Sequence, residues 1–406
     1  FRSYTTVGEI VAWVIGWDLI LEMLMAGSVV SKYWGVYLNQ FFELIGWNIN
    51  TNIAIGSFNF DLAPVIIVAF FTALLVMGTK IGARVDGALT ILKIAIVVFI
   101  VVVGFFYIKA ENFTPFIPPS EPAASTDGSG VSAVMEQPLW QWATGMAPSI
   151  YGVTGIISGA ALVFFAFLGF DVVATASEET INPKKNVPLG IGVGLGLIIV
   201  LYTLVAIVTT GMVSYKDLAK QSDPSLAVAF KMVGADWAAK IISLGIVIGM
   251  ATVVMVLLLG LTRVVFAMSR DGLLPRGLSH TGKHGTPVRL QIIVGVVMAL
   301  IAACCNVGIL SDMVNIGTLS AFTLVAISIP IMRKKRPDLE RSFKIPGNPW
   351  VPILIALANL WLMVNLSVLT WIRFVVWLIV GFAIYFGYGY RHARLGAGEL
   401  EVAAQE

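Results

Sequence analysis

The sequence has little charge. Lysine, arginine, aspartate and glutamate make up 12% of its 406 residues, whereas an ordinary soluble domain carries about 25%. The apolar fraction is 58%, and uncharged stretches such as residues 187–213 exceed the roughly 20 residues that cross a bilayer as a helix. Because a segment in lipid must satisfy its own backbone hydrogen bonds, the composition excludes a soluble domain and predicts an all-α integral membrane protein.

Cysteine and histidine are also scarce. The two cysteines, Cys304 and Cys305, are adjacent in an apolar stretch, so their side chains point apart on a helix and a disulfide is not expected. The three histidines form no cluster of metal-ligand type, and we expect neither a metal nor another cofactor. The net charge of +3 indicates no nucleic-acid partner. No convergent set of nucleophile and base is visible, so an enzyme is not expected.

Apolar stretches instead recur along the whole chain. Ten of them are predicted to span the membrane, at residues 7–30, 62–77, 88–108, 153–177, 187–213, 237–268, 290–307, 309–332, 351–369 and 374–390. The stretch at 237–268 is longer than a span requires, so we expect it to tilt or to begin outside the bilayer. The last two stretches are divided only around residues 371–373, which predicts a tight hairpin.

Lysine and arginine are distributed unevenly between the two sides. With the N-terminus in the cytoplasm, 18 of them fall on the inner side and seven on the outer side. This asymmetry favours that orientation, in the plasma (inner) membrane with both termini cytoplasmic. Residues 1–390 then form one transmembrane domain, residues 109–151 a long outer loop, and residues 391–406 a cytoplasmic tail.

One lysine lies inside a predicted span. Lys93 is about five residues from the cytoplasmic end of its stretch, roughly 8 Å deep at 1.5 Å per residue. It could extend its ammonium group to the inner interface. Alternatively, burial disfavours the charged form of the amine, so that Lys93 releases and rebinds a proton during function.

Acidic side chains occur in the spans as well, where a charge costs at least ~2.5–3.5 kcal/mol. Asp18 and Glu22 share one helix face, because a spacing of four is about one turn; they either make polar contacts to another helix or meet a cationic group in a cavity. Asp171 follows an aromatic, glycine-bearing run, where it either caps a broken backbone or contributes to a site. Asp312 is predicted to stabilise the outer N-terminus of its helix.

Several long motifs resemble one transporter family. FFAFLGFDVVATASEETINPKKNVPLGI, TRVVFAMSRDGLLPRGLSHTGKHGTPVR and IGTLSAFTLVAISIPIMR occur in this order. Together with TTVGEIVAWVIGWDLILEMLMAGS and GTKIGARVDGALTILKIAIVV, they resemble the amino acid–polyamine–organocation superfamily. The similarity is greatest to a bacterial form of its cationic amino acid transporter branch, and it covers roughly residues 3–391.

The resemblance implies a leucine-transporter-like fold of two inverted five-helix repeats plus two further helices. The first predicted span resembles the family's third helix, so the ten spans correspond to helices three to twelve of twelve. We expect the family's first two helices to be missing from these 406 residues. The first of them carries, in relatives, the N–H groups that hold the substrate carboxylate.

The resemblance also implies a substrate site in which the span at 153–177 is broken near residues 165–169. The carbonyls of Phe165, Ala166 and Leu168 would accept hydrogen bonds from the substrate ammonium, since the end of a half-helix carries partial negative charge. Phe165 or Phe167 would close over the substrate, with Asp171 next to the break.

Three residues on other spans complete the implied site. Lys93 resembles the intramembrane lysine of the family's proton-driven members, Glu22 an acid near the pocket, and Met255 part of the wall of helix eight. Met255 favours small neutral substrates such as alanine, whereas Glu22 would favour cationic ones.

The sequence thus predicts a proton-coupled amino acid symporter, driven by the proton gradient, that works by alternating access and has an amino acid, a proton and the lipid bilayer as its partners. A channel or a non-transporting membrane scaffold is the alternative from another class. A channel is expected to show a filter motif, and none is present in the sequence.

Overall fold

The fold was analysed in a computed structural model. It describes residues 9–47, 49, 51–55, 58–78, 83–122, 133–147, 149–169, 182–221, 223–280, 286–335, 345 and 347–392. The described part is predominantly helical, as the composition predicts, with two small two-stranded antiparallel sheets.

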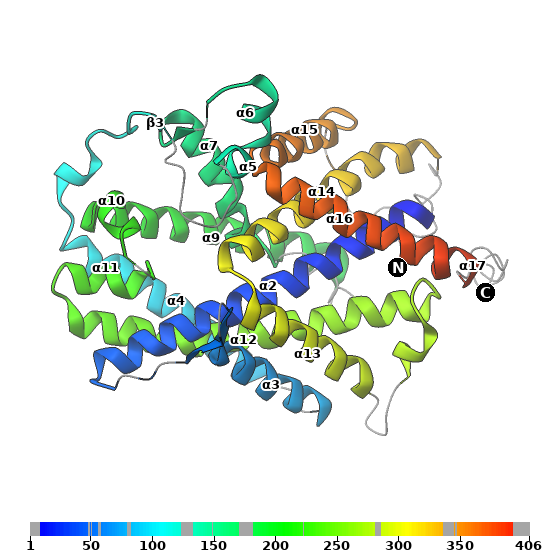
Figure 1. Cartoon of the computed structure of the whole chain (residues 1–406), viewed down its shortest axis with the longest axis horizontal. Coiled ribbons are helices and arrows are strands. Elements are labelled where there is room, and N and C mark those ends of the chain that lie inside the picture. The colour runs from blue at the N-terminus through cyan, green and yellow to red at the C-terminus, as the bar shows by residue number, and fades with distance from the viewer. Residues whose placement is uncertain are drawn as a thin grey trace.

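The helices follow one another along almost the whole chain (Figure 1). The α-helices are α2 (Glu9–Leu44), α3 (Leu62–Val76), α4 (Ala83–Phe105), α5 (Ala133–Glu136), α6 (Leu139–Thr144), α7 (Gly152–Val163), α9 (Pro183–Met212), α10 (Tyr215–Ala219), α11 (Leu226–Met232), α12 (Asp236–Arg270), α13 (Val288–Cys304), α14 (Val307–Lys335), α15 (Trp350–Val364), α16 (Val368–Ile384) and α17 (Tyr390–His392). Short 3₁₀ segments are η1 (Ala110–Phe113), η2 (Phe164–Phe167) and η4 (Arg276–Ser279), and η5 (Tyr385–Gly389) is a π-helical turn. Strands β1 (Asn52–Ile55) and β2 (Phe58–Asp61) pair with each other, as do β3 (Glu121–Pro122) and β4 (Ser149–Ile150).

Six described helices are long and apolar enough to cross a membrane, namely α2, α4, α9, α12, α14 and α16. Four shorter apolar helices, α3, α7, α13 and α15, lie in the remaining stretches that were predicted as spans. The all-α membrane fold is therefore confirmed. That each of the four shorter helices crosses the bilayer stays a prediction.

Helix α2 runs through the middle of the bundle (Figure 1) and packs against α12, α14, α13, α3 and α16. Small residues permit this packing, because helices in lipid associate through close van der Waals contact. Gly27 of α2 faces the side chain of Met298 on α13, and Gly317 of α14 lies against Leu21 and the backbone of Asp18. A Cβ atom at either glycine would require the neighbouring side chain, Met298 or Leu21, to shift.

The first span was predicted to end at residue 30, but α2 continues to Leu44. Its 36 residues correspond to roughly 54 Å, well beyond the ~30 Å hydrocarbon layer. Polar tertiary contacts hold the extension. Lys32 Nζ donates to the carbonyl of Cys305 at 2.5 Å, and the hydroxyl of Tyr37 accepts from the backbone N–H of Leu226 at 3.3 Å. Hydropathy marks only the lipid-facing part of a helix, so it could not place this end.

Two further predictions of helix boundaries are wrong. The last two helices are divided at residues 365–367, not at 371–373, because Ser367 caps α16 by accepting from the backbone N–H of Thr370 at 3.2 Å. Asp312 does not lie at a helix N-terminus, since α14 begins at Val307. Its carboxylate instead accepts a hydrogen bond of 2.9 Å from the hydroxyl of Thr370, which joins α14 to α16.

The first and last described segments meet at one end of the bundle (Figure 1). The hydroxyl of Tyr385, at the end of α16, donates to the carboxylate of Glu9 in α2 at 2.9 Å.

The described part of the predicted outer loop follows the C-terminal end of α4. Glu121 of this loop forms an exposed salt bridge of 2.7 Å with Lys216 of α10. Helix α6, which carries Trp140 and Trp142, packs near the start of α16.

Candidate functional site

The predicted break in the span at 153–177 is present. Helix α7 ends at Val163, and the next four residues form the 3₁₀ turn η2. Leu168 is then extended (φ −70°, ψ 156°), and Gly169 adopts a φ of +114° that favours glycine. The backbone is therefore not α-helical through 165–169, and carbonyls that a continuous helix would satisfy need other partners.

Helix α14 supplies the first of these partners. The side-chain amide of Asn315 donates to the carbonyl of Leu162 over 2.8 Å. Asn315 is completely buried. Two residues after Leu162, the ring of Phe164 packs edge-on against Phe322 of α14, with ring centroids 6.2 Å apart. Helix α14 thus holds the break on one side.

Helix α9 contacts the break from another side. The hydroxyl of Tyr202 donates to the carbonyl of Ala166 at 3.0 Å, and the Tyr202 ring lies 5.3 Å from that of Phe167. The carbonyl of Phe165 accepts from the backbone N–H of Leu168 at 3.2 Å. Two of the three carbonyls predicted to receive the substrate ammonium therefore already accept one hydrogen bond. A carbonyl has a second lone pair, so each retains one acceptor position.

Both predicted acids of α2 are buried. Asp18 is fully buried and Glu22 is 3% exposed. Asp18 faces Ser320 of α14, although neither of its carboxyl oxygens makes a hydrogen bond of good geometry to a described residue. Their neighbour Leu21 packs with Ala161 of α7 in one apolar cluster, which places this part of α2 next to the broken helix.

Lys93 lies on the face of α4 that packs against α12. A Cβ atom added to Gly249 would be 3.3 Å from Cγ of Lys93, so the glycine leaves room for the lysine stem. The hydroxyl of Thr252 donates to the carbonyl of Gly249 at 2.9 Å. The side chain was expected beside residues 251–252, and its contact with α12 lies within one helical turn of them.

Met255 is half-buried on α12 and packs in a cluster with Met23 and Leu24 of α2. Among the described residues that cluster contains none of α7. Met25 of α2 packs against both clusters and connects them. Asp171, the remaining predicted site residue, lies outside the described residues.

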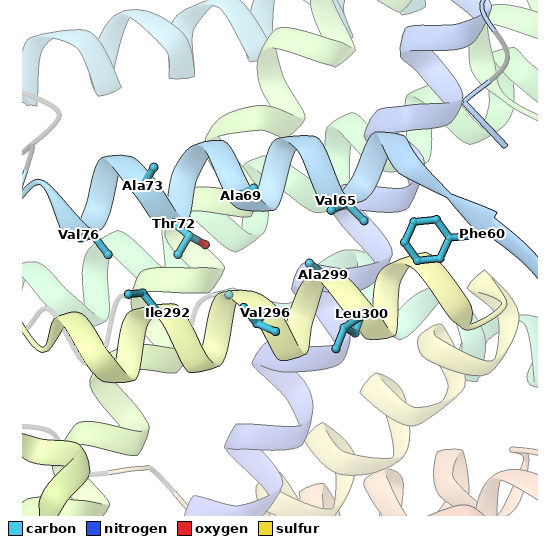
Figure 2. A pocket seen from close by; sticks show the side chains of 11 residues that line it. Phe60, Val65, Ala69, Thr72, Ala73, Val76, Ile292, Val296, Ala299 and Leu300 are labelled. Carbon is cyan, nitrogen blue, oxygen red and sulfur yellow. The ribbon is translucent and has the colours of Figure 1, made fainter. Parts of the chain in front are cut away.

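A groove between α3 and α13 is unsuitable for an amino acid. Figure 2 shows its lining, which runs from Phe60 to Val76 on one side and from Ile292 to Leu300 on the other. Its volume is about 460 Å³ and its walls are almost entirely apolar. The hydroxyl of Thr72 is bonded to the carbonyl of Val68 at 2.7 Å. Ligand sites need a few convergent polar groups, which the groove does not offer to an ammonium or a carboxylate.

Two residues of the site were missed by sequence reasoning, Asn315 and Tyr202. A signal for Asn315 exists, because polar side chains within spans bond across helices and Asn315 stands in the apolar run MVNIG. Among the polar side chains within the predicted spans, only the charged ones were interpreted as candidate site residues. Tyr202 carries no comparable signal, since a tyrosine in a membrane helix is equally typical of an anchor at the membrane–water interface.

Comparison with known proteins agrees with these features. The amino acid permease family model matches residues 3–387. The branched-chain amino acid permease BcaP of Bacillus subtilis is 40% identical over 97% of this chain and 79% of its own length. The methylthioribose transporter of the same organism is 39% identical over the same shares. A cationic amino acid transporter of Arabidopsis thaliana is 34% identical over 83% of this chain and 52% of its own.

These relatives are permeases and transporters, not enzymes, and the described part of this chain is a bundle that contains six helices long and apolar enough to cross a membrane. The chain belongs to the amino acid permease family, within the amino acid–polyamine–organocation superfamily.

Proposed function

We propose that this protein takes up neutral amino acids across the plasma (inner) membrane in symport with protons, by alternating access. The observation that carries the proposal is the break in α7, where carbonyls freed from α-helical pairing lie between α9 and α14. Transporters bind substrates at such discontinuous helices near the bilayer midplane. The carbonyls of Phe165, Ala166 and Leu168 would receive the ammonium group, and Phe167 would cover it.

Proton coupling is assigned to Lys93. Its stem packs on α12, a central helix of the bundle. An amine can bind and release a proton, and the resemblance to the family's proton-driven members gives this role to the intramembrane lysine. Binding and release of that proton would then bias the movement of α4 against α12.

The substrate preference depends on two residues. Met255 is apolar and bulky, and a long cationic side chain would have to pass it before reaching Glu22. We therefore expect small neutral amino acids such as alanine to bind best, and cationic ones more weakly. The names of two relatives suggest branched-chain amino acids and methylthioribose as competing candidates.

The orientation in the membrane is supported by the position of the termini and by the distribution of charge. The ends of the described chain lie at one end of the bundle, which agrees with two termini on the same side. The excess of lysine and arginine places that side in the cytoplasm.

The test uses purified protein in liposomes. Labelled alanine uptake is measured with and without an inward proton gradient, and unlabelled alanine, leucine, arginine and methylthioribose compete at equal concentrations. We expect gradient-dependent accumulation and the ranking alanine, leucine, arginine. Rapid flux that never exceeds equilibrium and shows no exchange of internal for external substrate would indicate a channel. Strong competition by methylthioribose alone would refute the amino acid assignment.

A further inference from the structure

The end of α7 creates an acceptor that is outside the predicted ammonium site. In a continuous α-helix the carbonyl of Leu162 would accept from the backbone N–H of Ala166. The 3₁₀ geometry of η2 shortens the pairing by one residue, so the Leu162 carbonyl loses that partner. A buried carbonyl without a hydrogen-bond partner lowers the stability of the fold by about 1–3 kcal/mol.

Asn315 donates to this carbonyl from a fully buried position on α14. Because a carbonyl only accepts, the amide nitrogen must point at Leu162, and the amide oxygen then points away. That oxygen is buried without a hydrogen-bond partner among the described residues. Other buried amides share this feature, Gln291 among them, so Asn315 is distinguished by the carbonyl at the helix break that its nitrogen holds.

The remaining contacts of the break show what the hydrogen bond can control. Phe322 lies two turns after Asn315 on α14 and touches the ring of Phe164, so α14 fixes the last α-helical residues and the first residue of η2 together. Tyr202 acts differently. It occupies the carbonyl of Ala166 itself, whereas Asn315 holds a carbonyl that the substrate does not need. Asn315 can therefore keep the break in place while the ammonium acceptors stay available.

We propose that Asn315 is a positioning residue for substrate binding, whose amide fixes the end of α7 and so sets the direction of the carbonyls of Phe165, Ala166 and Leu168. The proposal rests on the proposed function, since it assumes that these carbonyls receive the ammonium group of an amino acid. It adds a role for a residue on α14 that touches neither the substrate nor the proton site.

The test is Asn315→Asp, assayed by exchange of labelled alanine in liposomes with equal pH on both sides. Ionised aspartate presents only acceptors to the Leu162 carbonyl and repels it, whereas protonated aspartic acid can donate to it. We expect the KM to be raised about tenfold at high pH, since a lost buried hydrogen bond is worth roughly this factor. The KM should return toward the wild-type value as the pH falls, with a smaller change in maximal rate.

Each KM is expressed relative to the wild type at the same pH. This ratio removes the pH dependence that both proteins have in common, including that of the carboxyls of Asp312 on α14 and of Asp18 and Glu22 on α2 where the substitution leaves their titration unchanged. Gln291→Glu is the matched control, because it converts another buried amide to an acid on α13. Its KM ratio should not follow the same pH profile.

Asn315→Leu is a second variant that keeps the test decisive if Asn315→Asp does not fold. It removes the donor together with the unsatisfied oxygen, so the protein should remain monodisperse while the KM is raised at every pH. A wild-type KM in Asn315→Leu, or a KM ratio for Asn315→Asp that does not change with pH, would overturn the role of Asn315. Loss of all alanine exchange in the wild type would refute the proposed function and the Asn315 role with it. Exchange without proton-driven accumulation would refute only the coupling.

Discussion

Replacing Lys93 with alanine tests whether this side chain couples proton movement to amino acid transport. The lysine lies six residues from the start of the apolar stretch at Gly87, roughly 9 Å along the helix. Its stem fills the space that Gly249 leaves on α12. Lys93→Ala removes the amine and opens a small gap between α4 and α12, but it leaves the broken helix α7 and its contacts with α9 and α14 unchanged.

The expected magnitude follows from the driving force. One unit of pH gradient is worth about 1.4 kcal/mol per proton, so coupling of one proton to one substrate can hold a roughly tenfold gradient of amino acid. If Lys93 carries that proton, Lys93→Ala should reduce the ratio of internal to external alanine from about ten to about one. Exchange at zero gradient should persist, because the substrate contacts are retained.

The assay compares accumulation and exchange in the same liposomes. Lys240→Ala is the control, since Lys240 is an exposed lysine on α12, and its removal should leave accumulation unchanged. Accumulation by Lys93→Ala that matches the wild type would refute the coupling role. Loss of both accumulation and exchange, with a monodisperse protein, would show that Lys93 serves the structure of the transport path and not the coupling.

Three other expectations concern specificity, the broken helix and pH. Met255→Ser should open the pocket and raise competition by arginine against labelled alanine several-fold; an unchanged ranking would mean that Met255 does not line the pocket. Tyr202→Phe frees the carbonyl of Ala166, so the KM for alanine exchange should fall two- to threefold, about the value of one exposed hydrogen bond; a raised KM would mean that Tyr202 positions the turn. Burial raises the pKa of Asp61, the N-cap of α3, above 3.8. The free energy of unfolding should therefore fall as the pH rises from 3.8 through that raised pKa. Asp61→Asn should remove this fall in thermal unfolding scans, because asparagine does not titrate. The helix cap is kept, since asparagine still accepts from the backbone N–H of Ala63.

The sequence determined where the helices lie and where one of them breaks. Apolar length is a local property, because every backbone group in lipid must be paired within its own segment. The stretches found by hydropathy are accordingly helical in the described part of the chain. The break after α7 was implied by the family resemblance, and the glycine that follows FFAFL gives a local reason for it, since only glycine readily adopts the φ of Gly169.

Tertiary structure decided what each polar group contacts. The bond between Asn315 and Leu162 joins positions 153 residues apart, and no local pattern specifies such a pair. The extension of α2 to Leu44 depends on contacts from α11 and from the end of α13. The contact of Lys93 with Gly249 depends on how α4 is rotated against α12. Hydropathy gives the position of a residue along its helix, but the packing of neighbouring helices determines the direction of its side chain and its partner.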